Sequence, residues 1–101
     1  MKNEDYRLMV EARKRALLSN GTMLDRIRTA MEHEVELSFE EIMNMFTSTE
    51  VVPTDGGFNL YVYATKDVWA FSISFLCADF EYSTFIVDSI NYPYEGYEYA
   101  N

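Results

Sequence analysis

Apolar residues in the first half of the chain recur at spacings of three, four and seven, which places them on one face of a helix. The pattern covers residues 4–18, and it resumes from Thr22 to a point between residues 34 and 37. It predicts two helices. Gly21 is expected to end the first helix in the left-handed conformation, and Thr22 is expected to cap the second.

A third helix is expected to begin at Ser38. Glu41 stands three residues later, which predicts a capping box, and Leu37 can pack on Ile42 as a hydrophobic staple. The pattern fades at residues 47–49. The predicted buried side of this helix carries Phe39, Ile42, Met43 and Phe46.

The second half of the chain changes to β-branched and aromatic residues, which favour strands. Residues 58–65, 68–76 and 83–90 are predicted strands, and the short polar link at residues 66–67 predicts that the first two form a hairpin. A fourth strand could come from residues 51–52 or from the end of the chain. The order of elements predicts an α+β fold, with three N-terminal helices packed on a C-terminal antiparallel sheet of three to four strands.

Side chains of the second predicted strand alternate between large and small. The alternation predicts that the large-residue face meets the helices and that the other face is open. The large residues are Trp69, Phe71, Ile73, Phe75 and Cys77, and the small ones are Ala70, Ser72 and Ser74. Residues 1–101 are expected to form one domain, with a helical part at 1–49 and a β part at 50–101.

Charge narrows the range of partners. The chain has 17 acidic and 8 basic residues, a net charge of −9. Residues 1–28 hold seven bases and four acids, a net charge of +3, whereas residues 29–101 hold one base and thirteen acids, a net charge of −12. Such a chain is repelled by nucleic acid and by anionic membranes, and it is attracted to basic proteins.

The densest acidic run, EHEVELSFEE, begins where the second helix is expected to end. Acids at a helix C-terminus are disfavoured by the helix dipole, so they indicate a binding surface unless arginines of the first helix offset their cost. Acids spaced along a strand edge can also approximate a row of DNA phosphates. The candidate partner-binding acids are Glu32, Glu34, Glu36, Glu40 and Glu41, joined by Asp79 and Glu81, which are expected in the sheet.

The chain ends in NYPYEGYEYAN, in which tyrosines alternate with acids. Two interpretations stay open: the segment covers the sheet and closes the core, or it is a contact surface whose tyrosines supply rigid area and whose acids select a basic partner. The candidate partner-binding residues of this segment are Tyr94, Glu95, Tyr97, Glu98 and Tyr99.

Candidate catalytic and metal-binding chemistry is weak. His33 is flanked by acids, but position 37 is not the second histidine that a zincin motif requires. Cys77, the single cysteine, continues an apolar strand face and is expected to be an inert thiol. The sequence therefore predicts no catalytic residue, no metal and no cofactor. The absence of an internal disulfide and of an apolar N-terminal run favours a cytoplasmic protein, in the host cytoplasm if the protein is viral.

These features favour a small acidic, non-enzymatic inhibitor that occludes a basic site on a nucleic-acid-handling protein, with no membrane and no direct nucleic-acid contact. Anti-CRISPRs and other viral DNA mimics are analogous in size and charge. The alternatives are a toxin-nuclease immunity protein, a small regulatory or scaffold domain, or a helix-turn-helix regulator that uses Arg13, Arg26 and Arg28. A homodimer is compatible with each.

Overall fold

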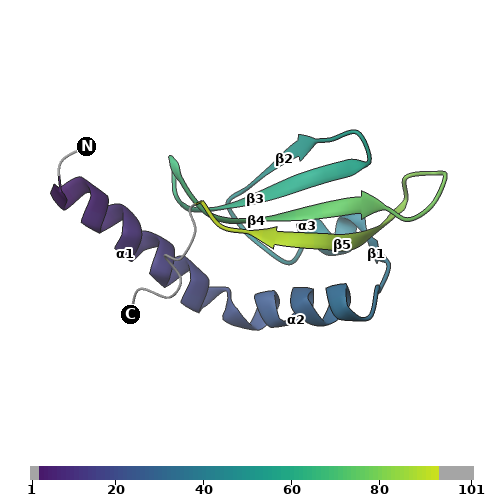
Figure 1. Ribbon diagram of the computed structural model, residues 1–101, viewed down its shortest axis with the longest axis horizontal. Coiled ribbons are helices and arrows are strands. Elements are labelled where there is room, and N and C mark those ends of the chain that lie inside the picture. The colour runs from purple at the N-terminus through teal and green to yellow at the C-terminus, as the bar shows by residue number, and fades with distance from the viewer. Residues whose placement is uncertain (1–2, 94–101) are drawn as a thin grey trace.

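The computed structural model describes residues 3–93, which form a mixed helical and β fold around a five-stranded antiparallel sheet. Strand order across the sheet is β1-β5-β4-β3-β2 (Figure 1). The elements in chain order are α1 (Asn3–Ser19), α2 (Gly21–Glu32), β1 (Leu37–Ser38), α3 (Phe39–Met43), β2 (Thr49–Pro53), β3 (Gly57–Thr65), β4 (Val68–Cys77) and β5 (Thr84–Asn91).

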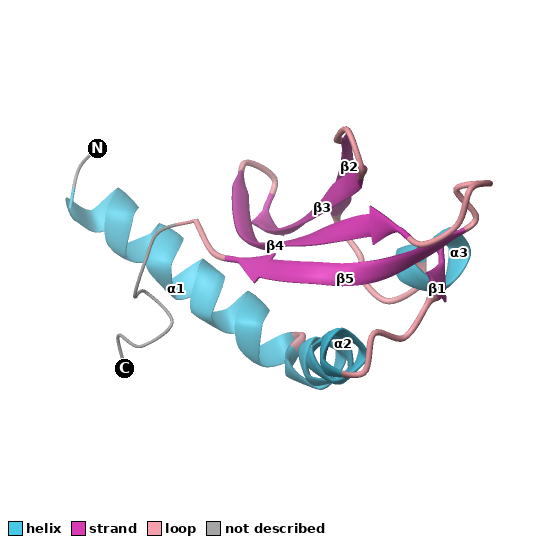
Figure 2. Cartoon of the chain, turned by 45° about the vertical axis from the view of Figure 1, so that its right-hand side comes forward, coloured by secondary structure: helices cyan, strands magenta, loops and turns pink. Residues whose placement is uncertain are grey.

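The two long helices follow one another along a single face of the sheet (Figures 1 and 2). α1 packs on β3 and β4, and α2 packs on β5. The core between these layers is apolar, and several of its side chains are shielded almost completely from solvent, which gives the largest contribution to folding free energy. The most fully buried large side chains are Phe71, Phe75, Ile27, Ile42, Leu60, Ile73 and Val62. No helix within residues 3–93 is long and apolar enough to cross a membrane.

The junction between the first two helices differs from the expectation. Gly21 is the first residue of α2 rather than the left-handed end of α1, and Asn20, not Thr22, occupies the N-cap position. The backbone of Asn20 (φ −102°, ψ 12°) stays close to helical geometry. Its N–H therefore donates to Ala16 O at 3.0 Å and its carbonyl accepts from Leu24 N at 2.9 Å. The hydrogen-bond ladder passes across the junction almost without a break.

The third helix begins as the sequence predicts but is shorter. Ser38 Oγ accepts from Glu41 N at 3.1 Å, and Ser38 N donates to Glu41 Oε1 at 2.9 Å, which completes the capping box. α3 ends at Met43. Leu37 and Ser38 also form β1, which pairs with Phe85 and Thr84 of β5. A strand of two residues leaves no periodic signal in the sequence.

The sheet has five strands, so the prediction of three to four was too low. The three strands expected at residues 58–65, 68–76 and 83–90 are present as β3, β4 and β5. The residues 51–52 option for a further strand is confirmed by β2, which pairs with β3 at the sheet edge. The end of the chain, the other option, lies outside the described residues.

The predicted face of Trp69 was wrong. Val62 on β3 pairs with Phe71, but the next residue, Tyr63, pairs with Trp69, so Ala70 is an extra residue in β4. This β-bulge reverses the alternation. Phe71 points into the core as expected, whereas Trp69 lies on the opposite, open face, where its ring meets that of Tyr61 edge-on at 5.1 Å between centroids.

Candidate functional site

The β2–β3 turn, the β4–β5 loop and the segment that leads from α2 into β1 meet at one end of the sheet, at the right of Figure 1. The β2–β3 turn adjoins the end of β4, because Cys77 N donates to Gly56 O at 2.8 Å. The β4–β5 loop follows directly, and β1 lies beside the start of β5 through the pairing of Ser38 with Thr84. We call this surface the acidic end, and its carboxylates are Glu34, Glu36, Glu40, Glu41, Asp55, Asp79 and Glu81.

Among the described residues, no lysine or arginine forms an ion pair with a carboxylate of the acidic end. The segments that build this end, residues 34–43, 54–57 and 77–85, contain neither lysine nor arginine. Within residues 3–93 the ion pairs lie on α1 and α2, where Arg7 pairs with Glu4 and Glu11, and Arg28 with Asp25. Lys66 lies in the β3–β4 turn, at the other end of the sheet. The acidic end therefore presents an uncompensated negative potential.

Asp79 organises the β4–β5 loop. Its carboxylate accepts hydrogen bonds from Ser83 N at 2.8 Å, from Ser83 Oγ and from Thr84 N at 3.3 Å. The bond from the Ser83 hydroxyl is the main cause of a lowered pKa at Asp79, and the backbone donors add to it. Asp79 is half-buried, and its hydrogen bonds hold the loop in shape.

Two aromatic rings project from this loop. Phe80 is fully exposed, and Tyr82, whose backbone has φ 56°, is 66% exposed. Phe39 at the start of α3 is exposed on one side, while its edge packs on Phe58 at 5.3 Å and on Phe85 at 6.4 Å between centroids. Fully exposed phenyl rings gain nothing from the fold of their own chain, and aromatic side chains are enriched at protein–protein interfaces.

The predicted acids differ in how far the fold engages them. Glu36 accepts from Thr84 Oγ1 at 2.8 Å. Glu41 belongs to the capping box, and the hydrogen bond from the Ser38 backbone lowers its pKa. By contrast the side chains of Glu34, Glu40 and Glu81 are exposed, and they form no hydrogen bond or ion pair with the described part of the chain. Glu32 is exposed at the last residue of α2.

The expected row of acids along a strand is not present at Asp79 and Glu81. β4 ends at Cys77 and β5 begins at Thr84, so both acids lie in the loop between the strands. Their negative charge is clustered at the sheet end rather than spaced along an edge. Five other predicted residues, Tyr94, Glu95, Tyr97, Glu98 and Tyr99, lie outside the described residues.

Phe80, Tyr82 and Asp55 were not among the site residues predicted from the sequence. A usable signal was present in ADFEYS, residues 78–83, where two rings alternate with two acids between predicted strands. An aromatic ring in a polar loop has no core to join, because connecting segments run over the surface.

The other candidate chemistry is not assembled into a site. His33 is exposed at the C-cap of α2. The half-buried thiol of Cys77 donates to Asp79 O at 2.8 Å. No group of three or more His, Cys, Asp or Glu side chains among the described residues is arranged to hold a metal ion. Arg13, one of the basic residues considered for DNA contact, is only 7% exposed and is therefore withdrawn from any DNA-facing surface.

Comparisons of the chain with protein-family models, with curated proteins and with solved structures found no match.

Proposed function

We propose that the protein is a small acidic inhibitor that binds a basic, nucleic-acid-binding surface of another protein and occludes it. The observation that carries the proposal is the acidic end itself: unneutralised carboxylates surround the exposed rings of Phe80 and Tyr82. As expected from composition alone, the partner is a basic protein such as a nucleic-acid-handling enzyme, and the setting is the cytoplasm, of a host cell if the protein is viral.

The carboxylates and the aromatic rings contribute differently to binding in this proposal. The exposed carboxylates of Glu34, Glu40 and Glu81 attract a basic partner and accelerate encounter, an effect that weakens as salt rises. The rings supply apolar contact area once the surfaces meet. Because the acids are clustered rather than arrayed, the protein imitates the charge density of nucleic acid more than the spacing of its phosphates.

A charge-reversal experiment separates site-specific binding from the effect of net charge. One variant carries Glu34→Lys, Glu40→Lys and Glu81→Lys at the acidic end. Its matched control carries Asp5→Lys, Asp67→Lys and Asp88→Lys, three exposed acids elsewhere on the molecule, with the same change in net charge. Partners are captured from nuclease-treated lysate on the wild-type protein, and both variants are then tested against the purified partner.

We expect the captured partner to be basic, to compete with duplex DNA for the protein, and to be lost by the acidic-end variant while the control retains it. Retention of the partner by the acidic-end variant would refute the proposal. So would a partner whose binding is indifferent to excess DNA, because that result describes a scaffold or regulatory domain instead.

A further inference from the structure

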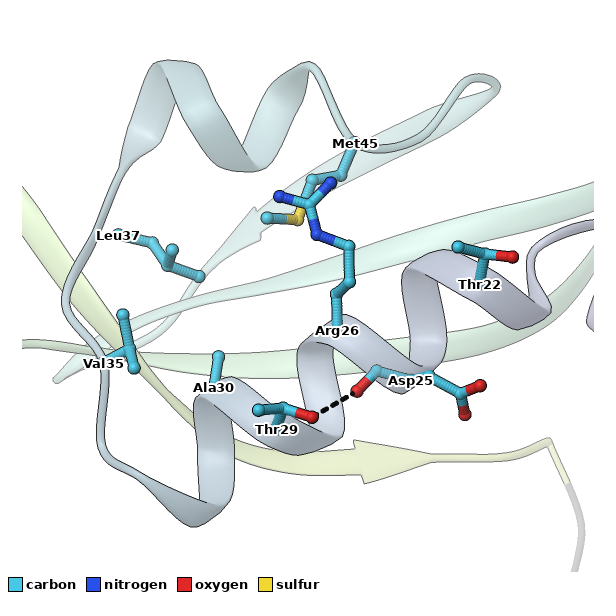
Figure 3. Close-up of a pocket in the computed structure, with 8 residues that line it drawn as sticks. All are labelled: Thr22, Asp25, Arg26, Thr29, Ala30, Val35, Leu37 and Met45. Carbon is cyan, nitrogen blue, oxygen red and sulfur yellow. Dashed lines mark hydrogen bonds between the residues drawn. The ribbon is translucent and has the colours of Figure 1, made fainter.

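A groove of about 480 Å³ lies between α2, the segment that leads from α2 to β1, and the segment after α3. Figure 3 shows the side chains that line it. Its volume falls in the range of small-molecule binding pockets. The apolar lining residues are Ala30, Val35, Leu37 and Met45, and the polar ones are Thr22, Asp25, Arg26 and Thr29.

The segment from residue 34 to residue 37 separates the groove from the acidic end. Val35 and Leu37 line the groove, whereas the alternate residue Glu36 is bonded to Thr84 of β5. Leu37 is buried in the core, but Val35 remains 44% exposed. A ligand seated here would remove the apolar surface of Val35 from water, which is favourable by about 25 cal/mol per Å².

Arg26 is the one basic side chain that lines the groove. In Figure 3 it extends from α2 toward Met45. Its Nη1 lies 3.7 Å from Met23 Sδ, a weak acceptor, and it forms no ion pair with any residue in the described part of the chain. Arg28, two residues on, is instead bonded to Asp25 at 3.1 Å and to the Tyr92 hydroxyl at 3.2 Å.

The other polar residues that line the groove determine which polar group a ligand needs in order to bind. The carboxylate of Asp25 turns away from the apolar lining in Figure 3 and is engaged by Arg28. The hydroxyl of Thr29 donates to Asp25 O at 3.0 Å, so it cannot donate the same proton to a ligand. The available charged donor is the guanidinium of Arg26, which favours a carboxylate because the two planar groups can form paired hydrogen bonds.

We infer that this groove is a binding site for an apolar monocarboxylate, with an acyl chain against Val35, Ala30 and Met45 and the carboxylate on Arg26. The site is independent of the acidic end. The guanidinium of Arg26 supplies the positive charge that would hold the carboxylate, because Arg26 is the basic side chain that lines the groove.

Octanoate and 1-octanol test the inference, because they share an apolar chain and differ in charge. Each is titrated into the ¹⁵N-labelled full chain, and amide shifts of residues 22–37 are followed. We expect octanoate to bind saturably at the groove, and more tightly than octanol by about tenfold, as a charge-assisted hydrogen bond permits. Arg26→Gln should remove that difference, whereas Arg15→Gln, an exposed change on α1, should preserve it.

Val35→Asp supplies a second variant, because it places a negative charge on the apolar wall and should abolish octanoate binding without touching the buried core. Three results would overturn the inference: no saturable shift with octanoate, shifts centred on another surface, or equal affinity for octanoate and octanol in the wild-type protein. Equal affinity would mean that the charge of Arg26 does not contribute to binding.

Discussion

Arg13 on α1 donates from Nε to the main-chain oxygen of Trp69 on β4, at 2.9 Å. The acceptor lies beside the β-bulge at Ala70, where the β3–β4 pairing is irregular. A helix residue thus hydrogen-bonds to a carbonyl 56 positions away in sequence, at the place where the sheet deviates from regular geometry. Because Arg13 is buried, this contact belongs to the fold rather than to a surface function.

Replacement of Arg13 by alanine should therefore destabilise the protein by about 1.5–3 kcal/mol, the usual contribution of a hydrogen bond to a charged group. Urea unfolding followed by circular dichroism measures the change. Arg15→Ala, on the exposed side of the same helix, is the control and should alter the free energy of unfolding by less than about 0.5 kcal/mol. Equal effects of the two changes would show that the Trp69 contact contributes nothing.

Two glycines should respond in opposite ways to alanine. A Cβ on Gly57 would lie 2.0 Å from the backbone oxygen of Phe75, so Gly57→Ala must displace β3 from β4. A Cβ on Gly21 meets nothing within 4 Å, and alanine suits the first turn of a helix. We expect Gly57→Ala to lower the Tm strongly. Gly21→Ala should raise the free energy of unfolding by about 0.4–1 kcal/mol. A tolerated Gly57→Ala would contradict the strand pairing described above.

Two phenylalanines distinguish the core from the acidic end. Phe71 is fully buried, and its replacement by alanine should cost about 3–5 kcal/mol. Phe80 is fully exposed, so Phe80→Ala should leave stability within about 0.5 kcal/mol while weakening binding to a captured partner. Thermal unfolding gives the first comparison and titration against the partner gives the second. A strongly destabilised Phe80→Ala protein would mean that this ring is part of the core.

Asp79 should make the stability of the protein sensitive to acid. Its pKa is lowered from the ordinary value of 3.8 because the folded loop donates hydrogen bonds to the carboxylate. Its contribution is therefore complete above pH 3.8 and is lost as the pH falls through the lowered pKa of the folded state. The Tm difference between wild type and Asp79→Ala should be constant near neutral pH and should shrink below pH 3.8.

Glu81→Ala controls for the loss of a carboxylate from the same loop. Glu81 is exposed and forms no hydrogen bond within residues 3–93, so this change should leave the Tm at neutral pH essentially unaltered. A Tm difference for Asp79→Ala that stays constant into acid would show that the loop hydrogen bonds do not favour the ionised carboxylate.

Periodicity identified the long elements and failed where geometry is set by distant residues. The helix predicted at residues 4–18, the capping box of Ser38 and the β3–β4 hairpin are encoded by neighbours in sequence, and all three are present. Strand β1 exists only because Leu37 and Ser38 meet β5, nearly fifty positions later, so no local pattern announces it. The face of Trp69 was misassigned because one bulge residue reverses the alternation that the prediction assumed.

Acid positions were easier to predict than their arrangement. The sequence places thirteen of the seventeen acids after residue 28, and the fold gathers seven of those thirteen at one end of the sheet. Some of these acids accept hydrogen bonds from other residues of the chain, and the sequence does not reveal which. Asp79 accepts from Ser83, and Glu36 accepts from Thr84. The rings of Phe80 and Tyr82 were not predicted, although the stretch ADFEYS alternates rings with acids between two predicted strands.

Residues 3–93 carry their charge unevenly along the molecule, which gives this part of the chain a permanent electric dipole moment. Lys14 and Arg15 lie on α1, toward the left of Figure 1, and the acidic end lies at the right. In the field of a cationic surface such a body experiences a torque as well as an attraction, and it turns Phe80 and Tyr82 forward before contact. In the function proposed above this orientation makes more collisions productive, so reversing Lys14 and Arg15 on α1 should slow association with the partner.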